Sequence, residues 1–211
     1  MAHVSDPSFL VLHALRLKGF IAVEAVAELT GLDADDVTDQ LEAFKGDGLA
    51  TYREGRLSGW SLTPDGRTRH GELIAAEVAA AACKDTIDAG YRQFLTVNQT
   101  LLGVCTDWQL RTVAGEQVVN DHTDAAHDKA VIGRLREVDD AVQPVCGSLG
   151  AQLARFSGYG PRLATAVGKV EKGDTDWFTK PLIDSYHTVW FELHEDLLAT
   201  LAIERAREGE G

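Results

Sequence analysis

Two groups of histidines and aspartates have the residue types that bind metal ions. The first group lies in the segment NDHTDAAHD and consists of Asp121, His122, Asp124, His127 and Asp128. The second is the pair His187 and His194 near the C-terminal end. Zinc and similar ions take imidazole nitrogens and carboxylate oxygens as ligands. Because helical residues seven positions apart are one turn too far apart to chelate one ion easily, we predict no metal site. We interpret these histidines as hydrogen-bonded groups packed in an aromatic core.

Signatures of catalysis are absent from the sequence. It contains no glycine-rich phosphate loop, no G-x-S-x-G segment and no H-E-x-x-H segment. Its three cysteines, Cys83, Cys105 and Cys146, are widely spaced and odd in number. This pattern favours reduced, buried thiols over disulfides, with a redox-sensing thiol as the alternative. We therefore predict that the protein is not an enzyme and binds no cofactor.

Seven residues of the N-terminal third have the chemistry of DNA contacts. Two of them, Thr38 and Gln40, can bond base edges, since glutamine pairs well with adenine. The other five are cations that can bind phosphate, namely Lys45, Arg53, Arg56, Arg67 and Arg69. These seven residues are our predicted DNA-binding set.

Negative charge opposes this prediction. The segment GLDADDVTDQLEAFKGDGL, residues 31–49, begins with nine residues that include four aspartates and no Lys or Arg. Those aspartates are Asp33, Asp35, Asp36 and Asp39. Three of them suit the positive end of a helix dipole, but all repel phosphate. The chain has a net charge of −13; seven bases and eleven acids give residues 1–70 a net −4, leaving −9 for the rest. Any DNA binding is therefore predicted to be weak and salt-sensitive.

Local signals predict the elements that position these residues. A helix is expected over residues 7–20, capped by Asp6 or Ser5 and stopped at Gly19. Further helices are expected over residues 22–31 and from Asp33 to Gly46, the latter packed through Val37, Leu41 and Phe44. A hairpin over residues 49–62, turning at 54–55, precedes a helix that starts at Pro64 behind Thr63.

This order of elements, with VAELTGLDADDVTDQLEAFKGDGL and LTPDGR at the expected spacings, resembles the winged helix-turn-helix of MarR-like bacterial regulators. The resemblance covers about a third of the chain. It implies a DNA-binding domain over residues 1–70 that acts as a homodimer on two half-sites.

The remaining sequence has helical periodicity throughout. Helices are expected over residues 67–89, 91–110, 124–141, 144–156, 161–172 and 181–207, with a loop over 111–124. Ten of the fifteen Phe, Trp and Tyr residues lie in this part. Core packing is their default use, and a small-molecule pocket or a dimer seam are the alternatives. The predicted pocket residues are Tyr91, Trp108, Trp177, Tyr186, His187, Trp190 and His194.

The sequence as a whole predicts a mostly α protein. A winged helix-turn-helix over residues 1–70 is followed by an all-helical domain over residues 71–211 that dimerises or senses a ligand. No apolar run approaches a membrane span and no signal peptide is recognisable, so we expect a cytoplasmic protein without a membrane partner. We predict a transcriptional regulator that binds double-stranded DNA and responds to a small-molecule effector. The alternative is a winged-helix module that binds a basic protein and no DNA.

Overall fold

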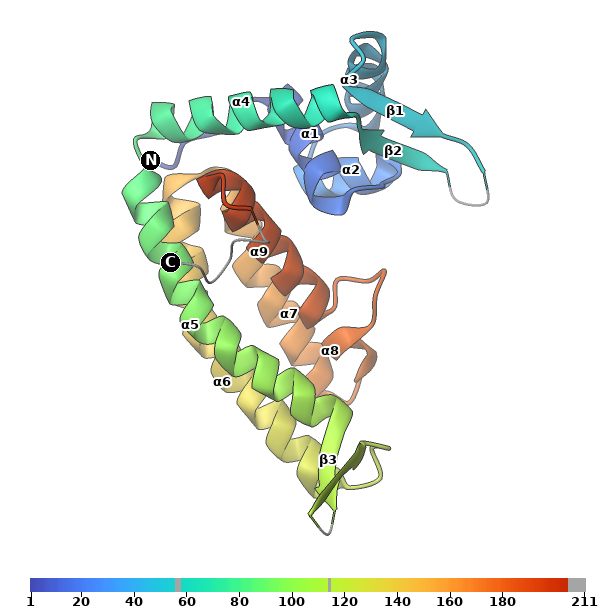
Figure 1. The fold of residues 1–211 in the computed structure, drawn as a ribbon, viewed down its shortest axis with the longest axis vertical. Helices are drawn as coiled ribbons and strands as arrows, with labels where there is room; N and C mark the ends of the chain where they lie inside the picture. The colour runs from blue at the N-terminus through green and yellow to red at the C-terminus, as the bar shows by residue number, and fades with distance from the viewer. Residues whose placement is uncertain (56–57, 114, 205–211) are drawn as a thin grey trace. The chain divides into compact units, whose positions relative to one another are not determined.

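A computed structural model describes residues 1–55, 58–113 and 115–204 (Figure 1). The described chain is mostly helical, as predicted, with two small two-stranded sheets. Its contacts form two compact units. We call residues 3–84 with 194–211 the N-terminal unit, and residues 85–193 with 1–2 the helical unit. Among the described residues, no helix combines the length and the apolar character needed to cross a membrane.

The N-terminal unit begins with the elements that its local signals predict. Asp6 caps the first helix by accepting a hydrogen bond from the Ser8 N–H, and Gly19 ends this helix with a φ of 73°. Gly31 ends the second helix with a φ of 72°, and Asp33 caps the third. The elements are α1 (Pro7–Lys18), α2 (Val23–Thr30), α3 (Ala34–Gly46), β1 (Ala50–Arg53), β2 (Gly59–Leu62) and α4 (Pro64–Ala81).

One apolar cluster holds these elements together. The α3 side chains Val37 and Leu41 are 0% exposed, as predicted, while Phe44 is half-buried against the same cluster. The other fully or nearly fully buried members come from α1, α2 and the hairpin, and include Val11, Leu12, Leu15, Val26, Trp60 and Leu62. Burying such side chains removes roughly 1.5–3 kcal/mol of unfavourable hydration each. Their spacing of three and four residues therefore fixes which face of each helix points inward.

The hairpin is fixed to the helices at both ends. Its strands pair antiparallel from Ala50 opposite Leu62 to Arg53 opposite Gly59, and Trp60 also exchanges two backbone hydrogen bonds with Ile21, just before α2. At the start of α4 the Thr63 hydroxyl accepts from the Gly66 N–H at 3.0 Å. Gly66 lies directly against the Leu49 backbone, where an added Cβ would be 1.9 Å from the carbonyl oxygen.

Four longer helices dominate the helical unit, together with a second hairpin. Helix α9 belongs to both units, since residues 186–193 count with the helical unit and residues 194–201 with the N-terminal unit. The elements are α5 (Lys84–Gln109), β3 (Leu110–Val113), β4 (Glu116–Val119), α6 (Ala125–Gln152), the 3-10 helix Ala154–Gly158, α7 (Tyr159–Glu171), α8 (Asp176–Thr179) and α9 (Tyr186–Leu201).

Two predicted elements of this part are wrong. The segment predicted as a loop forms the β3–β4 hairpin, whose strands pair Val113 with Glu116 next to Gly115 at a φ of 89°. The strands have four residues each, too short for a periodic signal. The predicted helix over residues 67–89 is broken, because Ala82 takes a left-handed conformation with a φ of 48° and ends α4. A left-handed alanine gives no sequence signal of the kind that glycine gives.

A third predicted element is wrong because of a proline. Pro144 was expected to begin a helix, but it lies inside the 28-residue α6, which continues from Ala125 to Gln152. Val142, Val145 and Leu149 are buried on either side of it, so packing outweighs the loss of one backbone donor. The predicted helix over residues 181–207 begins instead at Tyr186, after a turn in which Leu182 has a φ of 67°.

The two compact units are divided after Lys84 and after Leu193. The predicted domain boundary, residue 70, was expected within a continuous helix. That position lies in the middle of α4, which continues unbroken from Pro64 to Ala81. All of α4 belongs to the N-terminal unit, as does the end of α9. The N-terminal unit therefore combines two separate stretches of the sequence.

Candidate functional site

Helix α3 presents the predicted base-reading residues at the surface. Val37 and Leu41 face the core, which leaves Thr38 exposed and Gln40 half-buried. The Thr38 hydroxyl donates to the Ala34 carbonyl at 2.8 Å, so its proton is used within the helix while its oxygen can still accept. The Asp33 carboxylate accepts from the Asp35 N–H at 2.9 Å. Three of the acids at this end therefore have a structural use at the helix start.

The exposed surface of α3 is strongly acidic. Its carboxylates, including the cap, are Asp33, Asp35, Asp36, Asp39 and Glu42, all exposed. The only cation of this helix, Lys45, forms an ion pair with Glu42 at 3.1 Å. Five carboxylates and one ammonium leave this surface with a net charge of −4. The charge that the sequence assigned to this helix is thus displayed to solvent and is not hidden in the fold.

The predicted phosphate contacts lie on the hairpin and the first turns of α4. Arg53 ends β1 and is exposed, and Arg67 is exposed near the start of α4. Arg69 is also exposed and forms an ion pair with Glu72 at 2.9 Å. Such surface pairs contribute about 0–1 kcal/mol, so a phosphate can displace the carboxylate easily. Arg56, the remaining predicted contact, lies outside the described residues.

The residues predicted to line one ligand pocket are distributed over separate environments. Tyr186 and Trp190 are buried and stack at 5.9 Å between ring centroids, and the Trp190 Nε1 donates to Asn98 at 2.9 Å. Trp108 is buried in another aromatic group, 4.7 Å from the Phe178 ring. His187 is exposed.

The other three residues of the predicted pocket also lie in different places. Tyr91 is 6% exposed on α5. Trp177 is half-buried beneath the Lys169 ammonium, which lies 3.2 Å from the ring centroid. His194 is buried, but it belongs to the N-terminal unit. The aromatics of the helical unit thus pack mainly against one another. Within the described chain, the buried Tyr186 hydroxyl has no hydrogen-bond partner.

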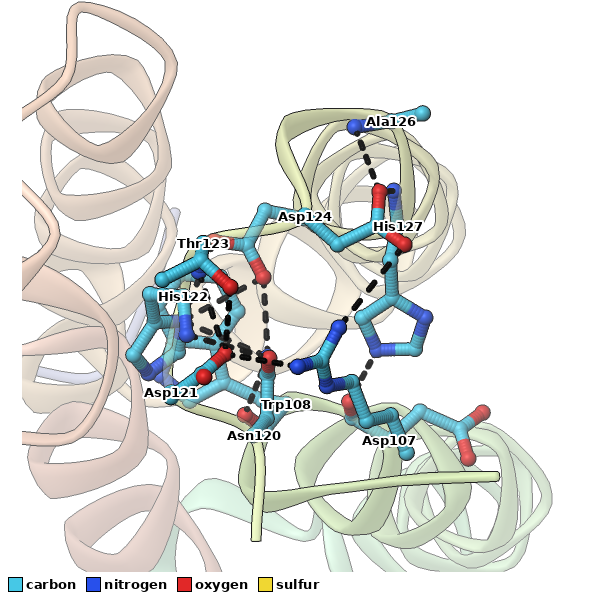
Figure 2. Close-up of polar contacts among 11 residues, drawn as sticks. Asp107, Trp108, Asn120, Asp121, His122, Thr123, Asp124, Ala126 and His127 are labelled. Carbon is cyan, nitrogen blue, oxygen red and sulfur yellow. Dashed lines mark hydrogen bonds and ion pairs between the residues drawn. The ribbon is translucent and has the colours of Figure 1, made fainter. Parts of the chain in front are cut away.

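His122, in the loop between β4 and α6 (Figure 2), pairs with Asp128 in the first turn of α6. The His122 Nδ1 lies 3.1 and 3.2 Å from the two Asp128 carboxylate oxygens. Asn120 fixes this arrangement, since its amide donates to Asp128 at 2.8 Å and to the Trp108 carbonyl at 3.1 Å. The same amide oxygen accepts from the His122 N–H at 3.2 Å, and the His122 ring lies 4.4 Å from the Trp108 ring.

In this pair a carboxylate binds one nitrogen of the imidazole, as in an acid–base group. Asp128 binds the Nδ1 of His122, so Nε2 is the nitrogen left to face outward, and the side chain is 44% exposed. His122 also has a left-handed backbone with a φ of 58°, which the Asn120 bond stabilises. The contacts explain the pair as a clamp on the loop between β4 and α6.

The neighbouring acids have structural roles as well (Figure 2). Asp124 caps α6 by accepting from the Ala126 and His127 N–H groups, and the latter bond is the main reason that the Asp124 pKa lies below its ordinary value. Hydrogen bonds from Thr123 likewise lower the Asp121 pKa, and Arg111 pairs with Asp121 at 2.9 Å. Within residues 1–55, 58–113 and 115–204, no three His, Cys, Asp or Glu side chains are placed to hold a metal ion.

The cysteines form no disulfide within the described chain and are mainly buried. Burial raises the pKa of the Cys105 thiol to about 11 and that of the Cys146 thiol to about 12. Both thiols are therefore protonated at neutral pH, and a protonated thiol is a poor nucleophile.

A second polar cluster, which the sequence did not suggest, lies inside the N-terminal unit. His13 of α1 contacts His70 of α4 and Asp196 of α9, and all three side chains are nearly fully buried. The one sequence signal was a histidine at an apolar position of a helix, between Leu12 and Ala14. Nothing in the sequence could identify its partners, which lie 57 and 183 positions away.

Comparisons of the chain with protein-family models, with curated proteins and with solved structures found no match.

Proposed function

We propose that the protein is a DNA-binding transcriptional regulator whose N-terminal unit is a winged helix-turn-helix of the MarR-like kind. The observation that carries this proposal is the order and packing of α1, α2, α3, β1 and β2 around one apolar cluster. Val37 and Leu41 anchor α3 in that cluster and leave its other face open, as a helix that enters the major groove requires. The hairpin, with Arg53 at the end of β1, supplies the wing.

Electrostatics set the strength of the proposed binding. The described cations of the predicted set are Lys45, Arg53, Arg67 and Arg69, and each can release about one counterion from DNA. Four contacts give a slope of about −3.6 in a plot of log K against log salt concentration. The five carboxylates of α3 act in the opposite direction, since each repels a phosphate at about 6 Å by roughly 0.7 kcal/mol in water. We therefore expect measurable binding at about 50 mM salt and a loss of roughly a hundredfold by about 200 mM.

The experiment is fluorescence anisotropy with sheared genomic double-stranded DNA across this salt range. Arg53→Ala should weaken binding on all sequences and reduce the magnitude of the salt slope by about one. Arg92→Ala is the matched control, because Arg92 is also exposed but lies on α5 in the helical unit. It should leave both quantities unchanged. Absence of binding by wild type at about 50 mM salt contradicts the proposal.

A second candidate follows from the acidic surface of α3. Five exposed carboxylates on one helix suit a basic protein surface, and binding to such a partner needs no DNA contact at all. Asp39→Asn separates the two candidates, because Asp39 is exposed and outside the first turn of α3. If α3 faces DNA, the variant binds DNA more tightly than wild type. If α3 faces a basic protein, the variant loses affinity for a lysine-rich peptide probe and shows no DNA binding.

Dimerisation and effector binding complete the proposed regulator. Two copies would bind adjacent half-sites, and the helical unit would supply the dimer contacts or the effector site. Analytical ultracentrifugation tests the first part, and a monomer at micromolar concentration would refute it. For the second part, a small molecule that changes DNA affinity must bind two conformations unequally.

A further inference from the structure

The β3–β4 hairpin of the helical unit is a sheet of two strands with two outer edges. Its register pairs Leu110 with Val119 and Val113 with Glu116. All four residues of β4 are exposed, whereas β3 begins with two half-buried residues. Within the part of the chain that the structure describes, no third strand pairs with either of them. The more exposed of the two edges is therefore that of β4.

The hydrogen-bond pattern of the hairpin shows which groups of β4 point outward. In an antiparallel ladder, hydrogen-bonded pairs alternate with pairs whose N–H and C=O groups point away from each other. The Asn120 N–H donates to the Gln109 carbonyl at 2.8 Å, so these two residues form a hydrogen-bonded pair. The next such pair along β4 includes Val118. Gln117 and Val119 therefore direct their N–H and C=O groups away from β3.

The side chains of β4 do not protect this edge. Free edges in natural sheets usually carry a lysine, a proline or a bulge. The sequence of β4 is Glu-Gln-Val-Val, which has no lysine or proline and a single charge at its first position. Val118 and Val119 are 37% and 74% exposed, and as consecutive residues they lie on opposite faces of the strand. An exposed apolar edge of this kind is suited to pairing with another strand.

Charge favours a second copy of the same hairpin as the occupant of this edge. The chain has a net charge of −13, and net charge of this size keeps copies of a protein apart. Residues 110–119 contain one arginine, Arg111, and one acid, Glu116, which gives them a net charge of zero. The hairpin is thus a neutral segment at which two copies can approach each other.

The outward groups determine the register of such a pair. Only one antiparallel register uses both outward-facing residues of β4, and it places Gln117 opposite Val119 of the second copy and the reverse. Each of these two pairs exchanges both of its N–H···O bonds. Val118 then lies opposite Val118 of the second copy, on the two-fold axis. Glu116 lies opposite Asn120 of the second copy, so no like charges meet.

The edge of β3 is less suited to pairing between copies. Its outward-facing residues are Leu110 and Thr112, since they pair with Val119 and Gln117 of β4. The corresponding symmetric register would place Arg111 of the two copies directly opposite each other, and like charges in that position destabilise a sheet. Pairing of β3 with β4 of the next copy would not close and would continue into a filament.

We propose that β4 of one copy pairs antiparallel with β4 of a second copy, so that the two hairpins form one four-stranded sheet. The contact is part of the proposed homodimer, and it therefore rests on that part of the proposed function. It does not depend on DNA binding. Because both copies use the same strand, the contact closes after two copies.

The first test is sedimentation equilibrium of the full chain with proline at each outer edge. Gln117→Pro removes an outward N–H from each copy and leaves the bonds to β3 in place. Since half of the bonds between the copies are lost, the dimer dissociation constant should rise about thirtyfold. Thr112→Pro, the matched control, removes an outward N–H of β3 and should leave this constant unchanged.

The outcomes separate this contact from the proposed homodimer. If wild type is a dimer and Gln117→Pro has the same dissociation constant, the β4 contact is wrong and the homodimer stands. If wild type is a monomer at every concentration, both are wrong and the edge serves a different partner.

A cysteine cross-link keeps the contact testable if Gln117→Pro does not fold. Residues that face each other in a non-hydrogen-bonded pair have Cα atoms about 4.5 Å apart, within the range of a disulfide. Val118→Cys should therefore form a disulfide-linked dimer in oxidised glutathione, seen on a non-reducing gel. Val113→Cys is the control, because Val113 is also exposed but lies on β3; it should give no more dimer than wild type with its native cysteines. A dimer without a cross-link at Val118→Cys would overturn the pairing.

Discussion

Replacing Gly66 by alanine tests how the start of α4 is fixed to the hairpin. In an exposed helix interior alanine is favoured over glycine by about 1 kcal/mol, so helix propensity alone predicts stabilisation. At Gly66 the added Cβ would lie 1.9 Å from the Leu49 carbonyl oxygen and 2.9 Å from its carbon. Both atoms belong to the backbone. Because real Cβ atoms essentially never approach within 3.0 Å, α4 and Leu49 must separate by about 1 Å.

The contacts at this point determine what the separation costs. The Leu49 carbonyl accepts from the Thr63 N–H at 3.0 Å and from the Thr63 hydroxyl at 3.1 Å. Weakening two hydrogen bonds costs about 1 kcal/mol each, and disturbing the Thr63 cap costs about 1 kcal/mol more. Against a propensity gain of about 1 kcal/mol, Gly66→Ala should lose about 2 kcal/mol of stability.

Gly71→Ala provides the matched control in the same helix. Gly71 is exposed, and a Cβ built on it meets nothing within 4 Å. This substitution should raise the free energy of unfolding by about 0.5–1 kcal/mol. Urea unfolding followed by circular dichroism measures both changes. If Gly66→Ala is as stable as Gly71→Ala, the close approach of α4 to Leu49 is not a constraint, and this reasoning is refuted.

Three further substitutions test the helical unit. Arg162 donates two hydrogen bonds to Asp184, of 2.8 and 2.9 Å, and one of 2.7 Å to Glu192, whose side chain is 3% exposed. Arg162→Met should therefore lower the free energy of unfolding, measured by thermal unfolding, by about 3–5 kcal/mol. Adding Glu192→Gln should restore part of this loss. The buried Tyr186 hydroxyl has no hydrogen-bond partner among the described residues, so Tyr186→Phe should unfold with equal or higher free energy. A loss above about 1 kcal/mol would mean that a bound group satisfies this hydroxyl. Burial raises the pKa of Asp139 above 3.8, so the folded state binds its proton more tightly and wild type gains stability as the pH falls through that raised value. Asp139→Asn lacks this gain. In urea titrations, the free energy of unfolding of wild type minus that of the variant should therefore increase as the pH is lowered from 7 to about 4. A difference that stays constant with pH would contradict the raised pKa of Asp139.

Local sequence signals were sufficient to predict the helix ends in the first half of the N-terminal unit. Asp6, Gly19, Gly31 and Asp33 mark helix ends through their own side chains or backbone freedom, so their effect is readable without partners. The exposure of Thr38 followed from the apolar spacing of α3 in the same way. These predictions depend on interactions within a few residues of each other.

Features that depend on distant partners could not be predicted. Pro144 is accommodated inside α6 because buried neighbours on both sides hold the helix. His187 was predicted on one inner face with Trp190 and His194; those two are buried, but His187 is exposed, and only packing decides which positions at the helix start turn inward. The cluster around His13 joins three helices that no local pattern relates.

The division of α9 between the two units affects how the protein is made. Residues 194–201 complete the N-terminal unit, yet they leave the ribosome roughly 110 residues after Lys84. Until then α1 and α4 lack Asp196, whose carboxylate contacts His13. Domains generally fold as soon as their chain emerges, but this unit must wait for the helical unit to be synthesised first. A nascent chain stalled after residue 84 should therefore expose a surface that chaperones bind, whereas one stalled beyond residue 201 and clear of the exit tunnel should not.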